Sequence, residues 1–204
     1  MYTHLAIAPS LRARTGAGPL LVVVAVVGLA ALAVAADPAA ADLKIATVSV
    51  FLNDNDVTVH VVLFDALPSS LQESLLTGIP VHIRLSVELR KQGTFRDPLV
   101  QQRIIERQVS YNVLTKDFRV TSVTGEQHEP YVSKDIRDAQ RVASDLRVSQ
   151  LFPGAQLDAR ELYFVRVRAE AALGGVNTWV ARFAGGAEET SWVRSPLLTP
   201  QRRQ

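Results

Sequence analysis

Histidine and carboxylate side chains are the groups in this chain best suited to acid–base or metal chemistry, and they meet in one short segment. His128 lies in Gly125-Glu126-Gln127-His128-Glu129-Pro130, where an imidazole and two carboxylates fall within four residues. Such groups can ligate a metal ion or exchange protons. Their spacing does not match the H-E-x-x-H pattern of a helix-borne zinc site. Glycine and proline bracket the segment, which favours a polar turn, and we predict no metal site.

Other catalytic patterns are absent from the sequence. The chain has no cysteine, which excludes thiol nucleophiles, thiolate zinc sites and disulfides, and it has neither a G-x-S-x-G nor an S-x-x-K motif. The acidic pairs Asp54/Asp56 and Glu188/Glu189 are interpreted as turn residues. We therefore predict no catalytic residue and no cofactor. A hydrolase, or a small-ligand-binding protein, with an unrecognised site stays open as the alternative, because carboxylate pairs can meet only in the fold.

Basic residues gather in the middle of the chain and form the candidate interaction site. Arginines and lysines between residues 84 and 119 alternate with the acids Glu88, Asp97, Glu106 and Asp117. One interpretation is a solvated sheet face with cross-strand ion pairs, and it is favoured because the acids halve the net charge. The other is a docking face for an acidic protein loop or an anionic envelope component. Its residues would be Arg84, Arg90, Arg103, Arg107 and Arg119.

Period-two alternation dominates the elements that must carry these groups. Residues 81–90 alternate apolar and polar without a break, which predicts a strand that buries one face and exposes His82, Arg84, Ser86, Glu88 and Arg90. Weaker alternation predicts strands at 45–52, 57–64, 100–114, 118–123, 162–169, 176–183 and 191–194. The fold class is therefore mainly β (β-rich α+β): an antiparallel sandwich or curled sheet of about seven to eight strands with two short helices.

Two helices are expected between the strands. The first has a capping box, Ser70-Leu71-Gln72-Glu73, follows Pro68, and should end at Gly78. The second is predicted over residues 133–146, where apolar residues from Ile136 to Leu146 form one stripe. Both are short enough to pack on a sheet.

The N-terminal segment predicts export. Arg12 and Arg14 precede an uncharged stretch at 15–36, and Ala39-Ala40-Ala41 offers small residues before Asp42. These are the parts of a secretory signal, so we predict a signal peptide at 1–41, with Asp42 as the first mature residue and Asp37 as the second choice. An uncleaved anchor is the alternative and the only basis for membrane contact. Either way the protein is periplasmic or otherwise extracytoplasmic.

The remaining residues, 42–204, have the length of a single domain. The whole chain has a net charge of +2, and loss of the leader brings the charge closer to zero. Such a chain is not a polycationic nucleic-acid binder, so no nucleic acid is expected among its partners.

The order of these signals resembles a known family. A helix and proline turn at 71–80 lead into the alternating strand, and after a loop a second segment of the pattern runs from Tyr111 to Val120. Leu151-Phe152-Pro153-Gly154 follows the second helix, and Ser191-Trp192-Val193-Arg194-Ser195 comes near the end. This pattern resembles the exported bacterial family described as domain of unknown function 4390. The resemblance implies no established activity. It implies a membrane sensor kinase as an envelope partner through gene neighbourhood alone.

Overall fold

The computed structural model describes residues 42–52, 56–174 and 186–200. The chain divides into two units, residues 1–39 and 40–204, and every described residue belongs to the second unit. The predicted leader at 1–41 and the predicted strand at 176–183 lie outside the described residues.

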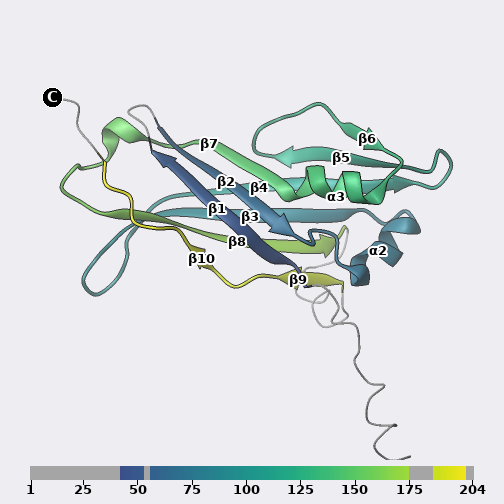
Figure 1. The fold of residues 1–204 in the computed structure, drawn as a ribbon, viewed down its shortest axis with the longest axis horizontal. Coiled ribbons are helices and arrows are strands. Elements are labelled where there is room, and N and C mark those ends of the chain that lie inside the picture. The colour runs from purple at the N-terminus through teal and green to yellow at the C-terminus, as the bar shows by residue number, and fades with distance from the viewer. Residues whose placement is uncertain (1–41, 53–55, 175–185, 201–204) are drawn as a thin grey trace, which may run out of the picture. The chain divides into compact units, whose positions relative to one another are not determined.

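The larger of two antiparallel sheets is built on four long strands. Short strands extend its edges, and the order along the sheet is β10-β8-β3-β4-β5-β6, with β9 also paired to β8 (Figure 1). The strands are β3 (Val81–Lys91), β4 (Leu99–Asn112), β5 (Asp117–Thr124), β6 (Tyr131–Ser133), β8 (Tyr163–Leu173), β9 (Ala187–Glu189) and β10 (Val193–Arg194).

The smaller sheet has three strands and packs against the larger one. Its order is β1-β2-β7, formed by β1 (Lys44–Leu52), β2 (Asp56–Phe64) and β7 (Asp145–Pro153). Val59 and Val61 of β2, Leu85 of β3 and Val167 of β8 belong to one buried apolar core between the sheets. The predicted β-rich antiparallel fold is confirmed. The described part of the chain has ten strands rather than seven or eight. The sequence analysis missed β6 and β9, which have three residues each, and also β7, whose nine residues follow α3 directly.

Strand β3 confirms the alternation at its apolar positions. The side chains of Val81, Ile83, Leu85, Val87 and Leu89 are fully buried. The expectation that all the intervening polar residues face water is wrong for Glu88, which is only 7% exposed. Strand β3 lies in the middle of its sheet, paired on both sides, so long side chains from β4 and β8 cover its polar face.

The first helix, α2 (Ser69–Leu76), begins differently from the prediction. Pro68 is its N-cap and no side chain caps it. The predicted capping box is therefore wrong: the Ser70 hydroxyl instead donates to Oε1 of Glu188 at 2.7 Å. Gly78 ends the helix as predicted, with a φ of +96° and its amide bonded to the carbonyl of Leu75.

The second helix, α3 (Ile136–Ser144), is shorter than the predicted 133–146 because its flanks pair as strands β6 and β7. Asp135 caps it by accepting the amide of Arg137 at 2.9 Å. Ala139 and Ala143 of the predicted stripe are buried. With eight residues in α2 and nine in α3, no helix in the described ranges is long and apolar enough to cross a membrane.

Candidate functional site

The five candidate arginines do not share one face of the large sheet. Arg84 and Arg90 lie on the face turned away from the small sheet, and Arg119 has the same orientation because it pairs with Ser110. Arg103 and Arg107 pair with Val87 and Ile83, so they lie on the core-facing side of β4. The prediction of a single basic docking face is corrected accordingly: two of its residues lie on the opposite side of the sheet.

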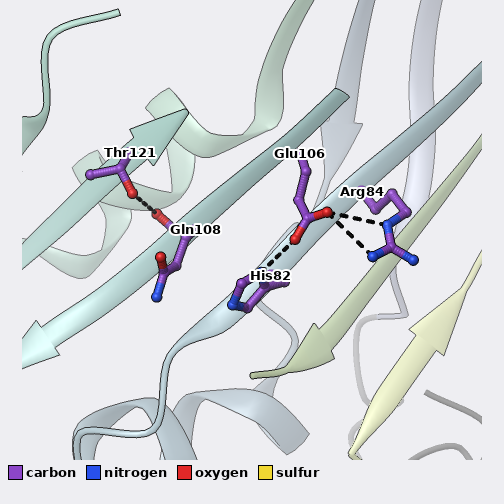
Figure 2. Close-up of polar contacts among 5 residues, drawn as sticks. All are labelled: His82, Arg84, Glu106, Gln108 and Thr121. Carbon is purple, nitrogen blue, oxygen red and sulfur yellow. Dashed lines mark hydrogen bonds and ion pairs between the residues drawn. The ribbon is translucent and has the colours of Figure 1, made fainter. Parts of the chain in front are cut away.

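On the outer face, Arg84 is already engaged with a neighbour. Figure 2 shows the Glu106 carboxylate between His82 and Arg84, with His82 Nδ1 at 2.6 Å and the Arg84 nitrogens at 3.3 and 3.4 Å. On the next strand, the Thr121 hydroxyl donates to the Gln108 carbonyl at 3.5 Å. Burial alone would raise the pKa of Glu106, but His82 and Arg84 outweigh it and the pKa is lowered.

Arg90 is engaged in a second cluster of the same kind. Glu88 accepts hydrogen bonds from Arg90 Nε at 2.6 Å and Arg166 Nε at 2.7 Å. Burial would raise the pKa of Glu88, yet the two guanidinium groups lower it overall. The Trp192 ring packs against two guanidinium groups: its centre lies 4.3 Å from Cζ of Arg166 and 4.8 Å from Cζ of Arg168. This part of the outer face uses its charges to hold the strands and the C-terminal segment together.

A pocket lies elsewhere, on the side where the sandwich is open between β5 and β7. Its volume is about 430 Å³, and α3 and the β5–β6 loop complete its wall. Its polar lining comes from β4, β5, the β5–β6 loop, β6, α3 and β7: Arg107, Ser122, Glu126, His128, Glu129, Tyr131, Arg141, Asp145, Arg147 and Ser149. Glu126, His128 and Glu129 of the predicted polar turn therefore line the pocket.

Local geometry sets the position of that turn. Gly125 has a φ of +102°, and a Cβ on it would lie 1.9 Å from Cγ2 of Ile105. Only glycine fits both the backbone angle and this close approach. The next residue, Glu126, then accepts the amide of Ser149 on β7 at 2.9 Å. The glycine and the carboxylate together fasten the β5–β6 loop across the open side.

The two core-facing arginines also cross the open side. Arg103 Nη2 donates to the Gln150 carbonyl of β7 at 3.3 Å, and Arg107 Nη1 donates to the Val142 carbonyl in the last turn of α3. A cation at the negative end of a helix is stabilising. Arg103 thus links the two sheets and Arg107 links β4 to α3, a structural role that the sequence analysis did not assign to them.

Burial and charge act against each other in this pocket. Burial lowers the pKa of the Arg107 guanidinium, while Asp145 and Glu126 oppose part of that shift. Hydrogen bonding from Ser149 lowers the pKa of Glu126, and His128 and Arg147 add to the effect. An arginine with a lowered pKa still carries its charge at neutral pH. The pocket thus contains fixed charges of both signs.

The pocket does not show the arrangement of a metal centre. Among the described residues, no group of three or more histidines, cysteines and acids could hold a metal ion. Nε2 of His128 is 3.9 Å from Oε2 of Glu126. One signal for the pocket was present in the sequence. Arg107 lies two residues from both Ile105 and Val109, so strand alternation already placed it on the apolar face.

Fold and site together describe an antiparallel β-sandwich with a polar pocket on its open side. The family model described as domain of unknown function (DUF4390) matches residues 40–191, and the chain belongs to that family. No curated protein and no solved structure matches the chain.

The segment near the end of the chain that suggested the family has a structural role in the described part. Ser195 is buried; its hydroxyl accepts the Val165 amide at 3.0 Å and donates to the Pro196 carbonyl at 2.8 Å. The Arg194 guanidinium lies 3.6 Å from the centre of the Phe164 ring. These contacts attach the C-terminal strand to β8.

Proposed function

We propose that this chain is a non-catalytic binding module of the bacterial cell envelope, and that it binds its ligand or partner at the pocket between β5 and β7. The observation that carries the proposal is the pocket itself. Its volume of about 430 Å³ falls within the usual range of about 300–1,000 Å³ for ligand sites. The outer face offers less support for docking, because Arg84 and Arg90 are engaged by Glu106 and Glu88.

The envelope location rests on the sequence. Basic residues, an apolar stretch and alanines before the expected cleavage position make residues 1–41 typical of a secretory signal. A chain without cysteine is also compatible with an oxidising compartment. The link to a membrane sensor kinase rests on the gene neighbourhood that the family implies. An accessory role beside such a kinase is the form of binding function that we favour.

The alternative is a hydrolase, and the pocket provides the observation in its favour, since His128 lies beside two carboxylates there. Binding is better supported because two of the three pocket carboxylates are already engaged and the third, Glu129, is exposed on a loop. Glu126 accepts the Ser149 amide, and Asp145 lies 2.6 Å from Nε2 of His60. Nε2 of His128 is 3.9 Å from Oε2 of Glu126, which is longer than a hydrogen bond, so this carboxylate does not orient the imidazole as a general base.

Photocrosslinking in intact cells tests the proposal. A photoreactive residue replaces Ser122 in the pocket, and a matched control replaces Ser86 on the outer face of β3. We expect a specific crosslinked product from position 122 and a weaker one, or none, from position 86. Equal capture from both positions, or stronger capture from position 86, would reject the pocket as the binding site. Fractionation of the same cells tests the location, and recovery in the cytoplasm would reject it.

A further inference from the structure

The pocket between β5 and β7 is lined by three arginines and three carboxylates, but the two sets are not equally engaged. Among the carboxylates, Glu126 accepts the Ser149 amide and Asp145 pairs with His60. Among the arginines, Arg141 lies 2.5 Å from Oδ1 of Asp138. Within the described ranges, neither Arg107 nor Arg147 has a carboxylate within 4.0 Å. The third carboxylate, Glu129, is exposed and has no described ion pair. Two arginines therefore stand unengaged in the pocket against one carboxylate, so its unengaged charge is mainly positive.

The two arginines reach the pocket from opposite layers. Arg107 comes from the large sheet and is half-buried, with one donor given to the Val142 carbonyl. Arg147 comes from the edge strand of the small sheet and is exposed. A guanidinium has five N–H donors in a planar fork, so each group retains donors for a ligand. A bound anion at a half-buried arginine also gains from the reduced solvent screening.

From this arrangement we propose that the pocket holds an anionic group, a carboxylate or a phosphate, between Arg107 and Arg147. Both groups present oxygens to which arginine binds through paired hydrogen bonds. The inference rests on the proposed function and names the ligand chemistry of the same site. It also gives Arg107 a second role: its link to α3 holds the guanidinium at the pocket wall.

The test is a titration of the protein, purified from cells that express the full chain, with inorganic phosphate and separately with succinate. Binding is followed by the NMR signals of the arginine Nε–H groups and of the Ser122 and Ser149 amides, at constant ionic strength set with sodium chloride. We expect at least one of the two probes to shift these signals saturably. A response to phosphate alone identifies a phosphate site, and a response to succinate alone identifies a carboxylate site.

Variants decide whether the arginines are responsible. In Arg147→Gln the apparent Kd for the active probe should rise at least tenfold, whereas Arg160→Gln, an exposed arginine that does not line the pocket, should leave it within twofold. The side chain of Arg147 makes no described hydrogen bond or ion pair, so its substitution should leave the fold intact. Absence of saturable shifts with both probes, or equal losses in the two variants, would overturn the inference. If crosslinking from position 122 persists in that case, the pocket binds a partner without an anionic group, and the proposed function stands.

Discussion

On the outer face of the large sheet, each of two buried or half-buried carboxylates lies between two basic side chains: Glu88 between Arg90 and Arg166, and Glu106 between His82 and Arg84. On the open side, Arg107 instead meets a helix carbonyl and has no ion-pair partner among the described residues. The first region is satisfied by the chain itself. The second retains donors beside a pocket, and that difference separates a structural charge cluster from a candidate binding site.

The largest expected effect comes from breaking the open side. Arg107→Gln removes a charged hydrogen bond to α3 and the packing of a long side chain, and should lower the free energy of unfolding by about 3 kcal/mol. The matched change Arg84→Gln affects a side chain that is 43% exposed and should cost less than about 1 kcal/mol. Urea denaturation followed by circular dichroism measures both.

The order of these two effects is the critical result. If Arg84→Gln is the more destabilising change, the assignment of Arg107 to the link between β4 and α3 is wrong. The sequence analysis placed both arginines on one exposed docking face, which would give them similar effects on folding stability. The structure instead gives the larger effect to Arg107.

A smaller effect is expected from the centre of the outer face. Glu88→Gln keeps the side-chain volume but removes the charge shared by Arg90 and Arg166, and should cost about 2 kcal/mol. Glu73→Gln is the control, because Glu73 is exposed on α2 and makes no capping contact. A thermal melt should show a clear loss for Glu88→Gln and no change for Glu73→Gln. Equal melting temperatures for Glu88→Gln and the wild type would show that the cluster adds no stability.

Much of the fold was predictable because its signals are local. The alternation in β3 and the apolar stripe of α3 each identify a buried face from neighbouring residues. The capping box at Ser70 failed because the helix already begins at Ser69, and the hydroxyl of Ser70 donates instead to Glu188, 118 residues away in sequence. No local pattern contains such a competitor.

The pocket was less predictable because it requires two layers to be placed against each other. The arginines were grouped by residue type, whereas their position in the strand decides the face on which they lie. Arg103 and Arg107 occupy the alternation phase of Ile105 and Val109. The alternation of β4 identified the side of the sheet on which these arginines lie. Only the placement of β7 and α3 opposite β4 showed that this side carries a pocket.

The smallest expected effect is the loss of stability that acidic pH causes at the two carboxylate clusters of the outer face. Glu88 and Glu106 have pKa values lowered from 4.5, so the unfolded chain binds more protons than the folded protein as the pH falls through this region. Their stabilisation is complete above about pH 4.5 and is lost as the pH falls through the folded-state pKa values. Asp65 has a pKa raised by burial, and its contribution has the opposite sign. The cost of Glu88→Gln should therefore be smaller at pH 3 than at pH 7. The cost of Arg107→Gln should change less, because arginine does not titrate in this range.

Urea denaturation of both variants and the wild type at pH 7 and pH 3 measures these costs. An undiminished cost of Glu88→Gln at pH 3 would mean that the side chain stabilises through its shape rather than its charge, and the contrast between the two regions would then rest on Arg107 alone.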